Sequence, residues 1–95
     1  MNLHAAHLQR RQAELDELDA ELKTLELKVE TARAAQNVGL YTQLQELRTQ
    51  VADIRRKIDE LRHAGDKDWD ELDEKLEAAW EELHGALERV RQSVR

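Results

Sequence analysis

Residues 15–29 read LDELDAELKTLELKV, and residues 40–61 read LYTQLQELRTQVADIRRKIDEL. In both stretches apolar side chains recur at alternating intervals of three and four residues, the spacing of a helix face that packs on another helix. Nearly all the positions between them hold charged or amide side chains. The apolar stripe consists of Leu15, Leu18, Leu22, Leu25, Val29, Ala32, Leu40, Leu44, Leu47, Val51, Ile54, Ile58 and Leu61. This pattern predicts an all-α fold built from packed helices.

The composition agrees with a coiled coil or helical bundle. Of the 95 residues 38% are charged, and the chain has three glycines and no proline, cysteine or phenylalanine. We expect a single domain over residues 1–95. A chain of this size with few aromatic residues builds a thin core, so self-association would help it. The lack of cysteine excludes disulfides and thiolate chemistry, and it fits a reducing compartment.

The net charge of −6 argues against binding to a nucleic acid, whose phosphates require a basic surface. We interpret the one basic strip as the solvated face of a helix, because Asp53 and Asp59 offset it. The strip consists of Arg55, Arg56, Lys57 and Arg62. Residues 1–12 contain no continuous hydrophobic run, so we expect no signal peptide or membrane span and a cytoplasmic protein.

Several carboxylates precede a lysine by four residues, which places both side chains on one side of a helix and stabilises it slightly. These expected pairs are Asp19 with Lys23, Asp53 with Lys57 and Glu71 with Lys75.

A turn is predicted at residues 64–68. Gly65 follows a periodic segment, as a C-terminal cap does, and Asp68 with Glu71 three residues later forms the pattern of a capping box. Acidic residues follow at the positive end of the helix dipole, and arginines complete the other end. We expect a helix over about 69–94.

Residues 36–41 leave two architectures open. In the preferred one a helix runs unbroken over about 3–63, because Val29 and Leu40 differ by only about 20° around a straight helix and the stripe stays on one face. In the alternative the chain turns near 37–39, Thr42 with Gln45 caps a new helix, and the chain forms a three-helix bundle.

In the preferred architecture the last helix folds back as an antiparallel hairpin, and the N-terminal half finds no partner in its own chain. We therefore expect a homodimer or higher oligomer, or pairing with another helical protein. The expected intersubunit contact is formed by Leu15, Leu18, Leu22, Leu25 and Val29. The expected intrachain hairpin core is formed by Leu47, Val51, Ile54, Ile58, Leu61, Trp69, Leu72, Leu76, Leu83 and Leu87.

Two Glu-x-x-His pairs have the spacing used in di-iron helical bundles, Glu60 with His63 and Glu81 with His84. Across the turn, however, the two histidines are roughly 22 Å apart along the helix axis, so they cannot share one site. His4 and His7 lie one turn apart and bind a metal only adventitiously unless other ligands join them. We expect no metal, no cofactor, no catalytic residue and no enzymatic activity.

Trp69 and Trp80 lie within about 20° of each other on a helix, which favours a role as core anchors. The alternative is an amphipathic helix that binds a lipid surface. The excess of acidic residues after residue 64 makes binding to anionic membranes the weaker interpretation. We therefore favour a structural or interaction protein that self-assembles through its helices.

The C-terminal third combines an Ala64-Gly65-Asp66 turn with two Trp-led segments, and Tyr41 precedes a Gln-Glu-Leu-Arg element at 45–48. These features resemble a family of small bacterial coiled-coil proteins, some of which are called stress-response proteins, over nearly the whole chain. Gly39 departs from the family pattern, which keeps a helix former there. The resemblance implies a cytoplasmic, non-enzymatic bacterial protein linked to acid or other stress, and it transfers no catalytic residue.

Overall fold

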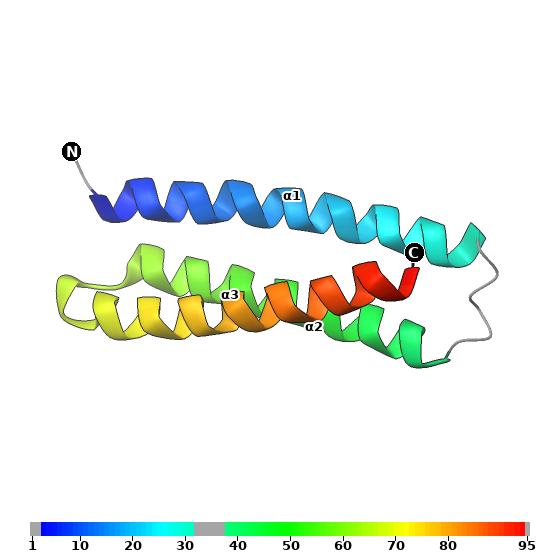
Figure 1. Ribbon diagram of the computed structural model, residues 1–95. Helices are drawn as coiled ribbons and strands as arrows, with labels where there is room; N and C mark the ends of the chain where they lie inside the picture. The colour runs from blue at the N-terminus through cyan, green and yellow to red at the C-terminus, as the bar shows by residue number, and fades with distance from the viewer. Residues whose placement is uncertain (1–2, 32–37, 95) are drawn as a thin grey trace.

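The computed structural model describes residues 3–31 and 38–94 and places them in three helices. These are α1 (Leu3–Thr31), α2 (Val38–His63) and α3 (Asp66–Val94). In Figure 1 α2 runs antiparallel to both of its neighbours, so α1 and α3 run parallel. No strand occurs within the described ranges. The all-α prediction is confirmed, and the three-helix alternative fits the structure.

The preferred prediction of one helix over about 3–63 is wrong, because α1 and α2 lie side by side. The Cα atoms extend over 49 Å along the long axis, about the length of one helix and well short of the roughly 90 Å of an unbroken one. Of the predicted turn near 37–39, residue 37 lies outside the described residues and Gly39 lies in α2. Thr42 does not cap a helix, because α2 begins four residues earlier at Val38.

The connection between α2 and α3 is shorter than the predicted turn at 64–68, because α3 begins at Asp66. Asp68 is not an N-cap: its backbone N–H donates to the carbonyl of Gly65 at 3.1 Å, inside the first turn of α3. Gly65 does not adopt the left-handed conformation of a C-terminal glycine cap. Its carbonyl instead begins α3, and Asp66 and Asp68 place negative charge at the positive end of the helix dipole.

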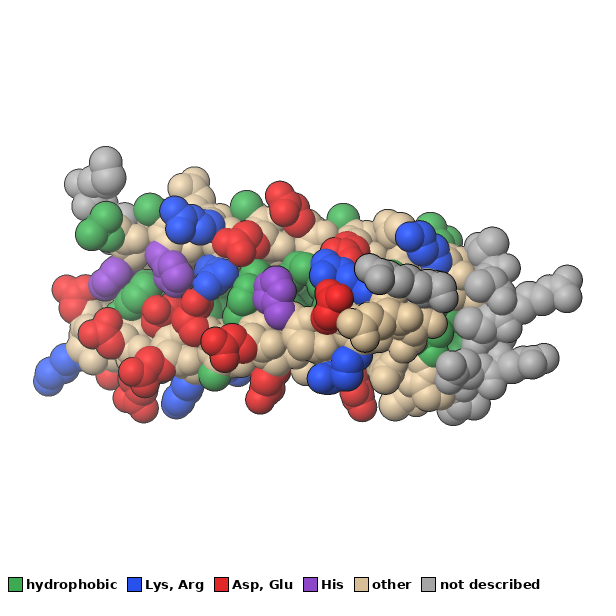
Figure 2. Space-filling model, in the orientation of Figure 1, with side chains coloured by type: hydrophobic (Ala, Val, Ile, Leu, Met, Phe, Trp, Pro, Cys, Tyr) green, Lys and Arg blue, Asp and Glu red, His purple; other side chains and the backbone are tan. Residues whose placement is uncertain are grey.

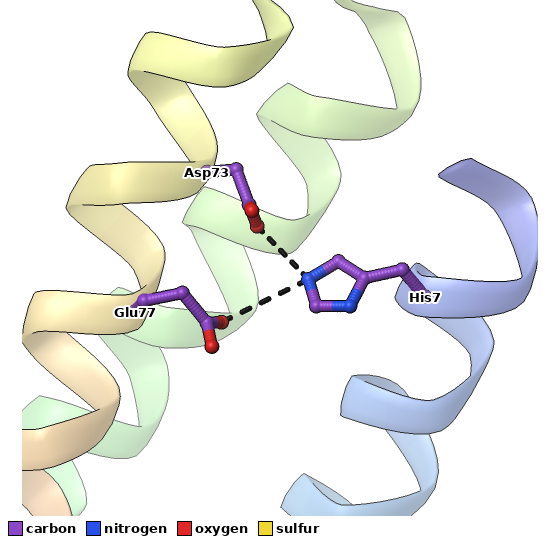
Figure 3. Close-up of side chains that lie close together, drawn as sticks. All are labelled: His7, Asp73 and Glu77. Atoms are coloured by element: carbon purple, nitrogen blue, oxygen red, sulfur yellow. Dashed lines mark hydrogen bonds and ion pairs between the residues drawn. The ribbon is translucent and has the colours of Figure 1, made fainter. Parts of the chain in front are cut away.

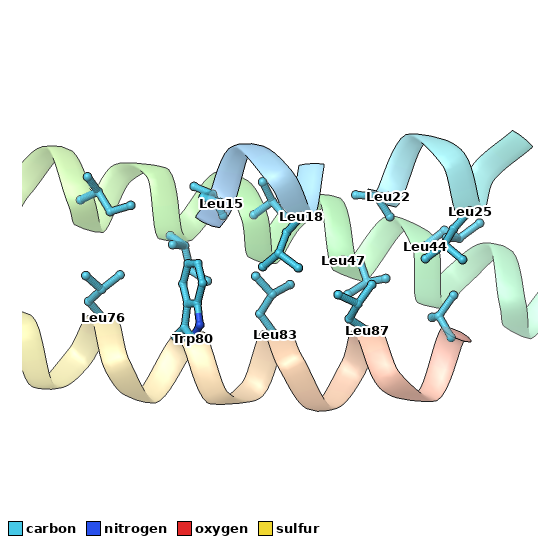
Figure 4. Packing of buried hydrophobic residues seen from close by; sticks show 14 of the residues in the cluster. Leu15, Leu18, Leu22, Leu25, Leu44, Leu47, Leu76, Trp80, Leu83 and Leu87 are labelled. Carbon is cyan, nitrogen blue, oxygen red and sulfur yellow. The ribbon is translucent and has the colours of Figure 1, made fainter. Parts of the chain in front are cut away.

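The core is a single apolar column along the bundle axis, to which every helix contributes (Figure 4). All predicted hairpin-core residues are buried except Leu72, which is half-buried. The five residues expected at an intersubunit contact are instead buried within one chain. Their exposed fractions are 0% for Leu15, 9% for Leu18, 3% for Leu22, 5% for Leu25 and 1% for Val29. The apolar surface that a second copy was expected to cover is therefore covered by α2 and α3.

Charged side chains outside the core form many local pairs. The expected i,i+4 pairs are present, with Lys57 Nζ 2.7 Å from Asp53 Oδ2 and longer contacts in the other two. The hydrogen bond from Lys57 is the largest cause of a lowered pKa at Asp53. Arg55 of the basic strip reaches across to Asp16 of α1 at 3.3 Å. The strip is thus largely neutralised by carboxylates of α1 and α2.

Gly85 lies in the interior of α3, and we expect Gly85→Ala to stabilise the protein by about 0.5–1 kcal/mol. A Cβ atom at this position would meet only the Arg89 side chain, at an ordinary 3.8 Å, and it would restrict the unfolded chain. Urea unfolding followed by circular dichroism measures the change. Ala78→Gly, at an exposed position of the same helix, should lower stability by a similar amount. Loss of stability in Gly85→Ala would contradict the placement of Gly85 within α3.

Candidate functional site

The seam between α1 and α3 has a different character from the other two helix contacts. The backbones of α1 and α3 approach least closely, and large polar and aromatic side chains fill the space between them. Figure 2 shows histidine, arginine and acidic side chains gathered along this seam, with apolar side chains visible between them. His4, His7 and Arg11 recur at three- and four-residue spacing, so they lie on the one side of α1 that faces α3. The seam is therefore the part of the bundle where imidazole, guanidinium and carboxylate groups meet.

One end of the seam is built on Trp69. The imidazole of His4 stacks on the indole at 3.8 Å between ring centroids and 6° between planes, and the His7 ring meets it edge-on at 5.7 Å. Trp69 is 8% exposed, so its ring forms a wall of the seam and of the core at once. Beside it a hollow of about 460 Å³ opens between the start of α1 and the α2–α3 connection.

The next turn of the seam brings one imidazole and two carboxylates together (Figure 3). His7 Nε2 lies 2.9 Å from Asp73 Oδ1 and 3.8 Å from Glu77 Oε2. Asp73 and Glu77 are four residues apart on α3, so both carboxylates point from one side of that helix toward α1. The three side chains are between 24% and 38% exposed. We call them the His7 cluster.

Arg11 lies beside the His7 cluster and holds Glu77 in a two-pronged ion pair. Its Nε donates to Glu77 Oε2 at 3.0 Å, Nη2 donates to the other carboxylate oxygen, and Nη1 donates to Glu14 at 3.2 Å. The guanidinium also sits 4.6 Å above the Trp80 ring, a cation–π contact. Partial burial opposes the charge of Arg11, but the hydrogen bond and charge of Glu77 outweigh burial, so the pKa of Arg11 is raised.

The far end of the seam is closed by Arg91 of α3. Its Nε and Nη2 donate to the two carboxylate oxygens of Glu21 at 2.5 and 2.6 Å, and Nη1 donates to Glu88 at 3.1 Å. The hydrogen bond from Arg91 is the largest cause that lowers the pKa of Glu21. This pair joins the last turn of α3 to α1.

The lowered pKa of Glu21 predicts a pH dependence of stability. The folded state favours the ionised carboxylate of Glu21 more than the unfolded state does. The Glu21–Arg91 pair therefore stabilises the protein above the ordinary carboxyl pKa, and this stabilisation is lost as pH falls through the lower pKa of the folded state. Thermal unfolding between about pH 5 and pH 3 should therefore show a shallower loss of stability in Glu21→Gln than in the wild type. Glu82→Gln, at an exposed position of α3, serves as the control and should follow the wild type. Identical profiles for all three proteins would contradict the Glu21–Arg91 pair.

The histidines of the Glu-x-x-His pairs do not come together. His63 is a largely exposed residue of α2 that lies 3.7 Å from Asp59. His84 sits on α3 with its ring 5.6 Å from Trp80. Both indoles are covered by their own chain, with Trp80 only 6% exposed, as expected of core anchors.

The hydroxyl groups of Thr24, Thr49 and Ser93 donate to carbonyl groups of their own helices rather than to a histidine that would activate them as nucleophiles. Thr24 donates to the carbonyl of Ala20 at 3.2 Å, and Ser93 donates to that of Arg89 at 3.0 Å. What the seam offers chemically is a set of electron-pair donors, one imidazole and two carboxylates, within reach of one another.

Sequence reasoning found His4 and His7 but missed Asp73, Glu77 and Arg11 as their neighbours. The pairs His7–Asp73 and Arg11–Glu77 share one sequence separation of 66 residues, because α1 and α3 run parallel in a constant register. This separation is set by the length of chain that reverses direction twice between the two helices, so no local sequence pattern reveals it. One signal in the sequence could have indicated the contact. His7 and Arg11 are four residues apart, as are Asp73 and Glu77, so a basic pair on one helix matches an acidic pair on another.

None of the helices that the structure describes is long and apolar enough to cross a membrane. No protein-family model, curated protein or solved structure matches this chain.

Proposed function

We propose that the protein is a non-enzymatic helical interaction protein whose partner is a second copy of the same chain. The proposal keeps the expectation of self-assembly but moves the contact from the buried apolar stripe to the opposite face of α1. A second regular stripe on that face carries the proposal. We call it the outer stripe, and it consists of the exposed residues Leu3, Ala6, Arg10, Ala13, Glu17, Ala20, Thr24 and Leu27.

The outer stripe has the spacing and the side-chain sizes of a helix-packing surface. Its members alternate at three and four residues, and alanine recurs every seven residues, which lets a second helix approach closely. Leu3 and Leu27 stand at the two ends and are 76% and 64% exposed. They are the large hydrophobic residues that the described part of the chain leaves exposed. The corresponding outward stripe of α2 is polar except for Ala52. It consists of Thr42, Gln45, Thr49, Ala52, Arg56, Asp59 and His63.

The order of residues along the outer stripe favours an antiparallel pair of α1 helices. If the two-fold axis lies level with Leu15, Leu3 of one copy faces Leu27 of the other, and Arg10 lies within one turn of Glu17 of the other. A parallel pair would instead bring Arg10 beside Arg10 and Glu17 beside Glu17, and like charges repel. Charge and apolar contacts thus agree on one orientation.

The contact would be small. A single helix face about 43 Å long buries less than the roughly 800 Å² per partner of a standard interface. We therefore expect a weak dimer whose population rises with protein concentration in sedimentation velocity or in small-angle scattering behind size exclusion. A single monomeric species at every concentration would refute the proposal.

Ala13→Glu combined with Ala20→Glu should weaken the dimer at least about tenfold, equivalent to about 1.4 kcal/mol. Both positions are exposed, so the core is undisturbed, and the bulkier side chains would keep the two helices apart. At position 13 the added carboxylate would also face Glu17 of the second copy. Sedimentation equilibrium measures the dissociation constant, and the melting temperature of dilute protein should change little. Gln45→Glu with Thr49→Glu adds the same charge on the exposed face of α2 and should leave the dimer intact.

A charge exchange tests the orientation. Arg10→Glu alone and Glu17→Arg alone should each weaken association, and the double exchange should restore it, because the pair is re-formed with reversed signs. If the double variant is no stronger than the single variants, the antiparallel register is wrong.

The family resemblance supports a wider proposal, that this assembly operates in the cytoplasm of a bacterium and is linked to stress. The absence of a membrane-spanning helix among the described residues is compatible with that location. The dimer tests above do not depend on this extension.

A further inference from the structure

We propose that the His7 cluster is a binding site for a divalent transition-metal ion of the zinc type, which ties α1 to α3. The three ligand atoms, one from each side chain, lie within 4.8 Å of one another. His7 Nε2 is already 2.9 Å from Asp73 Oδ1 and 3.8 Å from Glu77 Oε2. Tetrahedral zinc with bonds of about 2.0–2.1 Å places its ligand atoms about 3.3 Å apart. Small side-chain rotations therefore suffice to bring all three onto one ion.

The donor set favours zinc over the alkaline-earth ions. One imidazole nitrogen with two carboxylate oxygens suits Zn²⁺, whereas Ca²⁺ and Mg²⁺ prefer a full shell of oxygens. Three protein ligands leave the fourth position of a tetrahedron to water, which the partial exposure of the three side chains permits.

The local charge balance also favours a divalent cation. Asp73, Glu77 and Glu14 carry three negative charges around His7, and Arg11 supplies one positive charge. The carboxylates thus exceed the bases by two charges when the imidazole is neutral. An ion at the cluster would bind one oxygen of Glu77 in place of Arg11. Arg11 would retain its ion pair with Glu14 at 3.2 Å and its contact with the face of the Trp80 ring.

The cluster differs from an adventitious pair of surface histidines because α3 contributes two of its three ligands. His4 lies one turn from His7 but is stacked on Trp69, outside the group of converging ligand atoms. The edge contact of Trp69 with the His7 ring orients the imidazole from the side. Since the ligands come from opposite ends of the chain, ion binding would stabilise the folded bundle.

Titration calorimetry of the metal-free full-length protein with ZnCl₂ tests the site. We expect one ion per chain, and a melting temperature that rises on the order of 10 °C at about a hundredfold excess of zinc over the dissociation constant. His7→Gln and Asp73→Asn should each weaken binding at least about tenfold and abolish most of the rise. His63→Gln, which removes an exposed histidine of α2, should bind zinc as the wild type does. Co²⁺ should quench the emission of Trp69, whose ring is 5.7 Å from that of His7.

Two results would overturn the proposal. The first is the absence of saturable zinc binding. The second is unchanged zinc affinity in Asp73→Asn together with full loss of binding in His4→Gln, because that result would assign the zinc to an adventitious pair of His4 and His7. Melting curves in EDTA show whether each variant is folded without metal. If His7→Gln does not fold, the wild type is compared with Asp73→Asn alone. None of the three ligands of the cluster belongs to the outer stripe, so zinc binding and dimerisation can fail independently.

Discussion

A double variant with Leu22→Asp and Val29→Asp is expected to lose the three-helix fold. The two side chains are 3% and 1% exposed, and Leu22 lines a small cavity of the core with Leu47 of α2 and Leu83 of α3. Both aspartates would replace apolar side chains of the core, and a buried carboxylate that lacks a partner costs several kcal/mol. Two of them consume most of the roughly 5–15 kcal/mol by which a domain is stable.

Circular dichroism and thermal unfolding measure this outcome. The variant should show a large loss of helical signal and no cooperative transition at the melting temperature of the wild type. Gln45→Asp with Thr49→Asp adds the same two charges on the exposed face of α2 and should retain the fold. An unbroken helix that pairs with a second copy would behave differently, because the same substitutions would dissociate the copies and leave the α2–α3 hairpin helical. A variant that melts like the wild type would show that α1 does not pack as described.

Leu76→Ala is expected to lower the free energy of unfolding by about 3–4 kcal/mol. Leu76 is fully buried, and it projects from α3 into the core on the same side as Trp80 (Figure 4). Truncation removes apolar burial and leaves a cavity that helices on three sides cannot fill without moving. For a domain of this size the melting temperature should fall by about 15 °C.

Leu72→Ala provides the matched comparison for this prediction. Leu72 lies one turn earlier on α3 and packs against the core but is only half-buried. Its truncation should cost less than half as much as that of Leu76, because the removed methyl groups are already partly in water. Equal losses at the two positions would contradict the orientation of α3, whereas a small loss at Leu76 would contradict the packing of the core.

The register of α3 also decides how the seam is built. Rotation of α3 that buries Leu76 and Trp80 leaves Asp73 and Glu77 at the edge of the core, where they meet His7 and Arg11. The polar seam is therefore a consequence of how the apolar stripe of α3 is placed. If α1 did not pack beside α3, the carboxylates of Asp73 and Glu77 would face solvent.

Local patterns predicted the helical class and most of the buried residues. The three- and four-residue spacing from Leu40 to Leu61 predicts one buried helix face, whichever helix packs against it. On α3 both tryptophans lie on a buried apolar face of the same spacing. The local pairs Asp53–Lys57 and Asp19–Lys23 depend only on helical geometry, so they too follow from spacing.

The path of the chain was not decided by these patterns. Val29 and Leu40 are in phase on a straight helix, and both are buried when the chain reverses between α1 and α2, so periodicity fits either architecture. An interior glycine costs only about 1 kcal/mol and does not settle the choice either. The two architectures differ in which chain covers α1, and that depends on long-range packing.

The sequence by itself determined that this chain forms amphipathic helices and which of their faces are apolar, because both properties are set by side chains within one or two turns. Tertiary structure alone decided that α1 returns onto its own chain, that its stripe is covered internally, and that His7 meets Asp73 and Glu77. The contacts of His7 join residues 66 or more positions apart. Their geometry depends on two chain reversals and on the rotation of each helix about its axis, which only the packing of the whole core determines.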